Sequence, residues 1–390
     1  MTTLLPSTAE SNGRVGSARP AGWLSFDLHG RVRMGVARDA PTAPQLATMF
    51  ADFLVADAGA DPGPFDLTVS GQLEPVTDVA FAEDDFSYRA DAVCLRSPRL
   101  QIVRDGSGLR LNGGGELLTT VLPLLDRLMV ERGAAMIHAA TVSLNGLGIA
   151  LPAAGGVGKT STIAKLAKRD GMGFMGDDWA FVTADGRLLG FAKPMFIKPH
   201  HRPIYPDLFA GAHKPLVPKS LARPIGHLTT LVHPVVVQYP RVAAFVRRWS
   251  PEHMMIPPAD ALPGVPMVRT APLAASVYLE RHDGSTPALR EIDRAEMVGR
   301  MLGNFHIEMT VHSREIVNLL GATGMIPLHR QMSEKAAVLD RALAGVPSYL
   351  LRVPRGWTAD RASDAIVAQL DTIAPAGHDA PARPGPTSGR

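Results

Sequence analysis

The strongest constraint on the fold is a glycine-rich octapeptide, AAGGVGKT, at residues 153–160. It matches the phosphate-binding loop pattern G-x-x-x-x-G-K-[ST], except that alanine stands at the first glycine position. Glycines reach positive φ and let backbone N–H groups approach phosphate oxygens closely. An apolar run, LGIAL, precedes the loop, and TSTIAKLAKRD follows it with the apolar spacing of a helix. The sequence therefore predicts a strand, an anion-binding loop and a helix in this order.

The segments on either side of this unit predict two more strands. Asn145 and Gly146 separate AATVSL from LGIAL, and this pair is preferred in two-residue hairpin turns. The strand that enters the loop should therefore pair antiparallel with the strand before it. GFMGDD predicts a short strand that ends at Asp177 and Asp178, eighteen residues after Lys159. If that strand and the loop strand are neighbours, their carboxyl ends coincide and the two acids face the loop.

Each residue type in this pattern has a chemical reason. Consecutive N–H groups and a helix N-terminus attract anions. Lys159 can reach the β- and γ-phosphates of a nucleotide, and the hydroxyl of Thr160 can ligate Mg²⁺. One aspartate can hold the metal while the other accepts a proton from an alcohol, and the sequence leaves open which does which. The predicted nucleotide-binding residues are Gly155, Gly156, Val157, Gly158, Lys159, Thr160 and Ser161, and the predicted metal ligands are Thr160, Asp177 and Asp178.

Together these motifs resemble the catalytic domain of HPr kinase/phosphorylase and its relatives, a group structurally akin to phosphoenolpyruvate carboxykinase. The matching segments are Ile137-His138-Ala139-Ala140, Gly146-Leu147-Gly148, Gly155 to Thr160 and Gly176-Asp177-Asp178, with a weaker extension to Pro194 and Lys198. The resemblance implies an α/β fold: a P-loop core of mixed sheet with an antiparallel hairpin before the loop. It also implies ATP and Mg²⁺ as cofactors.

The resemblance further implies roles for single residues. Asp177 or Asp178 would act as base toward a serine hydroxyl, Lys159 would bind phosphate, and His138 would lie near the site. Apart from the resemblance, a basic cluster could neutralise phosphate or bind an acidic substrate, and we favour Lys198 among its residues, Lys198, His200, His201 and Arg202. Two departures stand out: threonine replaces the usual serine at Thr160, and the second glycine-rich signature of HPr kinases is absent. The second departure argues against HPr itself as the acceptor.

Several arginines could also stabilise a transferred phosphate, as an arginine finger does. Arg281 ends an apolar strand, and Arg247 and Arg248 precede a tryptophan. The sequence does not select among them.

The chain divides by pattern into five parts. Alternating strands and one helix predict an N-terminal β-rich α+β domain over 21–111. The P-loop catalytic domain is expected over 112–350, and a C-terminal strand and helix over 351–373. The ends, 1–20 and 374–390, are rich in Ser, Gly and Pro, and we expect them to be disordered.

The composition of the chain indicates which classes of binding partner and which cell compartment to expect. The net charge is only +3 and no dense basic run occurs, which argues against nucleic acid. The sequence has no uninterrupted stretch of about 18 apolar residues, so we expect no membrane-spanning helix. A single cysteine, Cys94, and the absence of a signal-peptide pattern favour the cytoplasm. Proteins of the family that the chain resembles often form oligomers, so the resemblance leaves a homo-oligomer possible.

The leading hypothesis is an ATP-dependent, Mg²⁺-requiring kinase that phosphorylates a hydroxyl group. The first candidate for this acceptor is a serine of a protein or peptide. A small-molecule alcohol, such as an amino acid, a sugar or a secondary metabolite, is the close alternative. A nucleotide-binding regulator without chemistry is a third hypothesis, against which the paired acids argue. Decarboxylation in the manner of the carboxykinases would require a second metal with His and Lys ligands, for which no motif is present.

Overall fold

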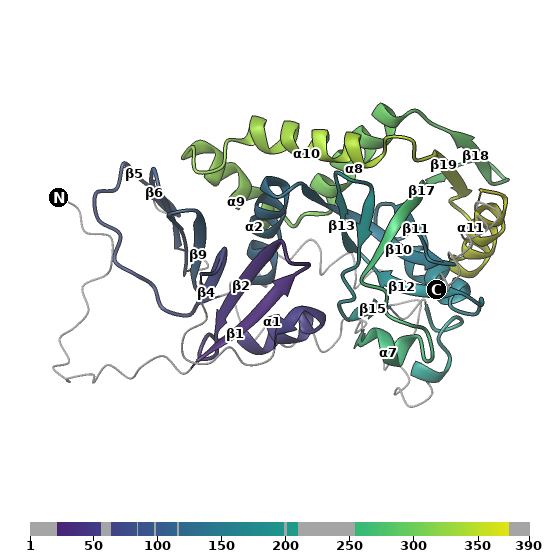
Figure 1. The fold of residues 1–390 in the computed structure, drawn as a ribbon, viewed down its shortest axis with the longest axis horizontal. Helices are drawn as coiled ribbons and strands as arrows, with labels where there is room; N and C mark the ends of the chain where they lie inside the picture. The colour runs from purple at the N-terminus through teal and green to yellow at the C-terminus, as the bar shows by residue number, and fades with distance from the viewer. Residues whose placement is uncertain are drawn as a thin grey trace, which may run out of the picture.

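The computed structural model describes residues 22–55, 64–83, 85–96, 99–114, 117–198, 201–209 and 254–373. Within them the protein is mixed α/β, with two large sheets and several helices (Figure 1). The two ends of the chain, which were expected to be disordered, lie outside the described residues. The same holds for three residues considered as phosphate or substrate contacts: His200, Arg247 and Arg248.

The first sheet is built from the alternating segments near the N-terminus. Its strand order is β3-β1-β2-β4-β9-β8-β7-β6-β5. β2 and β9 pair parallel with β4, whereas the other pairs are antiparallel. The strands are β1 (Trp23–Leu28), β2 (Val32–Ala37), β3 (Leu54–Val55), β4 (Leu67–Ser70), β5 (Phe81–Ala82), β6 (Phe86–Arg89), β7 (Ala92–Arg96), β8 (Arg99–Asp105) and β9 (Gly108–Gly113). The helix α1 (Ala43–Met49) and a 3-10 turn at Ala51–Phe53 precede β3.

The second sheet contains the segments around the glycine-rich loop. Its order is β11-β10-β13-β14-β17-β19-β18, with β12 on β10 and a further pairing of β11 with β17. β10 is buried along almost its whole length, including its polar residues His138, Thr141 and Ser143. The strands are β10 (Ala134–Leu144), β11 (Leu147–Pro152), β12 (Met172–Gly176), β13 (Trp179–Thr183), β14 (Arg187–Leu189), β17 (Thr270–His282), β18 (Ala288–Glu291) and β19 (Ser348–Pro354). A small ribbon pairs β15 (Met195–Ile197) with β16 (Met254–Ile256).

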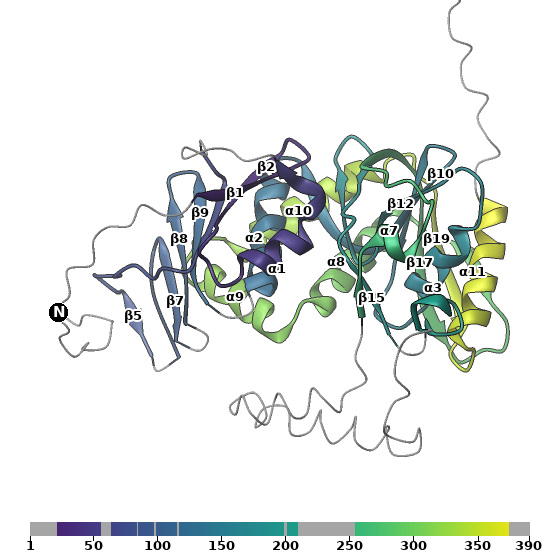
Figure 2. The same ribbon diagram turned by 90° about the horizontal axis from the view of Figure 1, so that it is seen from below.

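Helices cover the second sheet and connect it to the first. α2 contacts both β2 and β10 and lies between the sheets together with α9 and α10, as both views show (Figures 1 and 2). α11 packs on α3 at the opposite end of the second sheet. The helices are α2 (Leu117–Glu131), α3 (Lys159–Leu166), α7 (Pro258–Ala261), α8 (Arg294–Glu308), α9 (Val311–Ala322), α10 (Leu328–Ala342) and α11 (Ala359–Ile373). Every helix in the described ranges is too short or too polar to span a lipid bilayer.

One of the apolar clusters contains side chains from both sheets. The ring of Phe50 stacks on that of Phe191 with centroids 5.1 Å apart, and His29 packs edge-on against Phe181 at 6.2 Å. One cluster of buried side chains includes residues from the first sheet, α2, β10 and β13. Near residue 111 the chain passes from the first sheet to α2 and the second sheet, and this cluster crosses between them.

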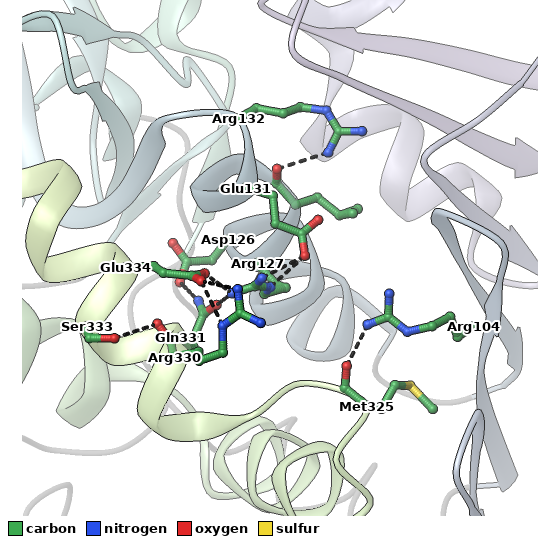
Figure 3. A network of polar contacts seen from close by, with 11 residues as sticks. Arg104, Asp126, Arg127, Glu131, Arg132, Met325, Arg330, Gln331, Ser333 and Glu334 are labelled. Atoms are coloured by element: carbon green, nitrogen blue, oxygen red, sulfur yellow. Dashed lines mark hydrogen bonds and ion pairs between the residues drawn. The ribbon is translucent and has the colours of Figure 1, made fainter.

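A polar network joins α2 to α10. Arg127 donates to Glu334 at 2.6 Å and also bonds Glu131 and Gln331 (Figure 3). Asp126 accepts two 2.9 Å bonds from Lys335, and both side chains are buried. Burial lowers the pKa of Lys335 to about 8, and Asp126 opposes that shift. The pair fixes how α10 sits against α2.

Candidate functional site

The loop and the paired aspartates leave the second sheet at the same edge. The condition considered above, that β11 and β12 are neighbours, is not met, because β10 lies between them and pairs antiparallel with both. Two strands antiparallel to a common partner run parallel to each other. Pro152 of β11 lies opposite Ala139, and Gly176 of β12 lies opposite Thr141. Both strands therefore end beside the same short stretch of β10.

The hairpin before the loop follows its turn residues. Asn145 and Gly146 have φ of 51° and 83°, and β10 and β11 pair antiparallel on either side of them. In the loop, Gly156 and Gly158 have φ of 79° and 122°. These conformations suit glycine and strain other residues. Gly158 caps α3, so the loop N–H groups stand at a helix N-terminus.

Lys159 lies beneath the loop. Its ammonium donates to the carbonyl oxygens of Ala153 at 2.7 Å and Ala154 at 3.2 Å. Burial lowers the pKa of Lys159, while Asp178 and Asp177 oppose that shift. The side chain is therefore held by the loop, with both acids close enough to act on its charge.

Asp177 accepts one side-chain hydrogen bond, from the first turn of α3. The hydroxyl of Thr160 donates to its Oδ2 at 2.7 Å. Its Oδ1 is buried and has no hydrogen-bond partner among the described residues. Burial, reinforced by the charge of Asp178, raises the pKa of Asp177 to about 6. A buried carboxylate oxygen without a hydrogen-bond donor destabilises the fold, and a bound cation would compensate its charge.

Asp178 is held in a strained conformation by three partners. Its φ is 116°, which is uncommon outside glycine and is tolerated here because its backbone pairs with Ala139. Lys193, almost fully buried, donates to its Oδ2 at 2.9 Å. Burial alone would raise the pKa of Asp178, but Lys193 and then His138 hold it well below its usual range. Asp178 is thus a charged acceptor in a fixed place.

His138 and Glu308 complete the group. Nε2 of His138 lies 3.8 Å from Oδ1 of Asp178 and 3.9 Å from Oε2 of Glu308. Glu308 is the last residue of α8, and its Oε1 accepts the N–H of Gly155 at 2.7 Å. Asn304, one turn earlier, donates to the His138 carbonyl at 2.9 Å. A carboxylate therefore occupies a loop N–H that the sequence pattern assigns to phosphate.

These groups surround one cavity of about 570 Å³. Of the residues predicted from the sequence, it is lined by His138, Gly155, Gly156, Gly158, Lys159, Thr160, Asp177, Asp178 and Lys198. Val157 and Ser161 do not line it, because Val157 packs into the core and Ser161 is fully buried. Lys198 is exposed, and its N–H bonds Nδ1 of His201, which also lines the cavity.

Arg281 is not part of the site. Its guanidinium donates to the carbonyl oxygens of Pro354 and Trp357, and it does not line the cavity. The other two candidate arginines lie outside the described residues. Among the described residues, the buried cation nearest the acids is therefore supplied by Lys193.

Sequence reasoning missed three residues of the site: Lys193, Tyr205 and Glu308. Tyr205 places its hydroxyl 3.4 Å from the carbonyl oxygen of Thr160, and burial raises its pKa. Lys193 follows a short strand in FAKP, a segment without a defining pattern. Glu308 lies 130 residues after Asp178 and reaches the loop only because α8 ends there. No local sequence pattern identifies Lys193 or Glu308 as a residue of the site.

The residues present fit Mg²⁺ better than a metal held wholly by protein. Among the described residues, no group of three or more His, Cys, Asp or Glu side chains could hold a metal ion. Mg²⁺ in nucleotide sites needs only one or two protein oxygens, since phosphates and water supply the others. The hydroxyl of Thr160 and the unpartnered oxygen of Asp177 are such oxygens.

The chain matches no protein-family model, and no curated protein matches it. The assignment of a function therefore rests on the geometry of the site.

Proposed function

We propose that the protein is an ATP-dependent, Mg²⁺-requiring phosphotransferase that acts on a hydroxyl group, first a serine of a protein or peptide. The observation that carries the proposal is the contact of Thr160 with Asp177, which joins the loop to the acids. Binding alone needs the loop but not two carboxylates beside it. The finer fold assignment, a P-loop core related to HPr kinase and phosphoenolpyruvate carboxykinase, belongs to the same proposal.

In this reaction the chain's residues have distinct tasks. The loop N–H groups and Lys159 bind the phosphate oxygens, as in other phosphate-binding loops. Thr160 and Asp177 would hold Mg²⁺, which neutralises phosphate charge when it is bound. Asp178 accepts the proton of the acceptor hydroxyl as its oxygen bonds to the terminal phosphorus and the bond to the ADP oxygen breaks. Lys193 keeps Asp178 charged and in place.

A small-molecule alcohol is the second candidate acceptor. The cavity of about 570 Å³ is of the size that small ligands fill, so it suits a compact molecule as well as the tip of a peptide. The N-terminal region contributes to it through Met49 of α1, which supports a role of that region in acceptor binding.

Transfer of labelled phosphate tests the proposal. The protein is incubated with γ-labelled ATP, Mg²⁺ and serine peptides, and then Asp178→Asn, Asp177→Asn and Lys159→Ala are compared with wild type. We expect label transfer to fall by about 10²-fold or more in the Asp178 variant while MgADP still binds. Asp170→Asn, an exposed aspartate after α3, should behave as wild type. Nucleotide binding without transfer to any acceptor would instead favour the regulator.

A further inference from the structure

The cavity has walls of two kinds. One wall carries the charged groups: the loop, Lys159, both aspartates and Lys193. The other consists of apolar side chains from α1, α2, β13 and the junction of α8 with α9. We call this set the apolar wall; its residues are Met49, Leu122, Pro123, Trp179, Phe305 and Met309.

The apolar wall is the part of the shared core that opens to the cavity. Leu122, Trp179 and Met309 are only partly buried and pack against the core cluster. The indole of Trp179 is fixed by Phe305, which meets it edge-on at 5.5 Å. On the charged side, Trp179 packs against His138 at 5.1 Å. A rigid apolar surface therefore lies directly beside the proposed reacting groups, where covering it is favourable.

The hydroxyl groups of Thr310 and Ser313 also line the cavity, and both already make hydrogen bonds. Thr310 caps α9 by accepting the N–H of Ser313, and the two hydroxyls bond each other at 2.9 Å. The hydroxyl of Ser313 also donates to the carbonyl of Thr119. Pro123 has no N–H to give that carbonyl a partner within the helix, which explains why the side chain does so. The wall therefore offers a sugar or another polyol few free hydrogen-bonding groups.

The apolar wall adjoins the acids, so it belongs to the acceptor side. Trp179 directly follows Asp178 in the chain, and the nucleotide phosphates belong at the loop and Lys159. A molecule that presents its hydroxyl to Asp178 consequently covers Trp179. We infer that the acceptor carries a bulky apolar group beside its hydroxyl, and that this group packs against Trp179, Leu122 and Met309.

This inference rests on the proposed function and defines its substrate class. Two sources share the chemistry: a serine next to a bulky apolar residue in a peptide, and a small apolar alcohol. Burial of one such group is worth about tenfold or more in affinity. Polyols lack it and should be poor acceptors.

Matched acceptors test the inference. Transfer from γ-labelled MgATP is measured to N-acetyl-phenylalanyl-serinamide, N-acetyl-glycyl-serinamide, 2-phenylethanol and glucose. We expect kcat/KM for the phenylalanyl peptide to exceed that for the glycyl peptide at least tenfold. A preference for 2-phenylethanol over both peptides would identify the small alcohol as the source. Equal values for the two peptides, or a preference for glucose, would overturn the inference.

Variants of the wall locate the effect. Met309→Gln keeps the side-chain length and should reduce the phenylalanyl-to-glycyl ratio severalfold without changing the KM for MgATP. Met332→Gln, an exposed methionine on α10, is the matched control and should keep the ratio. A ratio unchanged in Met309→Gln and in Leu122→Gln would remove the wall from acceptor selection.

Equilibrium binding separates this inference from the proposed function. Peptide binding is followed by tryptophan fluorescence with excitation at 295 nm, with Trp179→Phe as the reference for the signal. If no acceptor receives phosphate but the phenylalanyl peptide still binds at least tenfold more tightly than the glycyl peptide, the function fails and the wall's selectivity holds. If transfer occurs without that selectivity, only the inference fails.

Discussion

Asp177 should weaken the fold at neutral pH, and replacing it with asparagine should stabilise the protein while abolishing phosphate transfer. Its carboxylate is buried beside Asp178, and one of its oxygens has no donor. Asparagine removes the charge and keeps an oxygen that can accept the bond from Thr160. The same substitution removes a proposed metal ligand.

The magnitude follows from the pKa of Asp177. It rises from 3.8 to about 6 on folding, and each unit corresponds to about 1.4 kcal/mol. Because the folded state holds this proton more tightly, the contribution of Asp177 to stability is fully present below pH 3.8 and is lost as pH rises through about 6. At pH 8 the charged form therefore costs up to about 3 kcal/mol. Burying the new amide N–H offsets part of that gain, so we expect Asp177→Asn to gain about 1–3 kcal/mol.

Urea denaturation at pH 5 and pH 8 measures this gain. The variant should be more stable than wild type at pH 8, and the difference should shrink at pH 5. Saturating Mg²⁺ should also shrink it, because a cation bound at Asp177 stabilises only the wild-type fold. Asp105→Asn, a largely exposed aspartate on β8, serves as the control and should show neither effect.

An Asp177→Asn variant that is less stable than wild type at pH 8 would refute this reasoning. It would mean that the carboxylate is compensated in the folded protein by a donor or cation, and that its pKa is not raised. A gain of equal size at both pH values would also contradict it, because the effect would then not come from charge.

Three further substitutions test other contacts. Lys193→Met leaves Asp178 charged without its partner, so we expect a loss of about 2–4 kcal/mol in urea denaturation and of phosphate transfer. Glu308→Ala frees a loop N–H for phosphate, so the affinity for MgADP in calorimetry should rise roughly fivefold, the equivalent of about 1 kcal/mol. Lys335→Met leaves Asp126 charged and buried, so thermal denaturation should show a loss of about 3–5 kcal/mol.

Exposed residues of the same types serve as controls. Lys168→Met should leave stability within about 0.5 kcal/mol of wild type, and Glu315→Ala should leave MgADP affinity unchanged. Weaker MgADP binding in Glu308→Ala would show that this carboxylate supports the nucleotide instead of competing with it. A Lys193→Met variant of wild-type stability would show that solvent in the cavity suffices to compensate Asp178.

The local chemistry of the site could be read from the sequence. Asn145 and Gly146 predict a turn because few other residues adopt positive φ, and β10 and β11 do pair antiparallel across them. The glycines of the loop and the following helix are likewise short-range features. The mixed α/β class follows from such elements, and the structure has it. The proposed nucleotide and acceptor chemistry remains a prediction.

The arrangement around the loop was decided by long-range packing. The sequence left open whether β11 and β12 are neighbours. In the structure β10 pairs with both, and no local pattern encodes which strand lies in the middle. Lys193, Glu308 and the apolar wall reach the cavity from segments far apart in the chain. Short-range spacing fixes turns, loops and helix starts because their geometry depends on neighbouring residues alone. Which side chains meet across a cavity depends on how whole elements bury their apolar faces, and only the tertiary structure determines that.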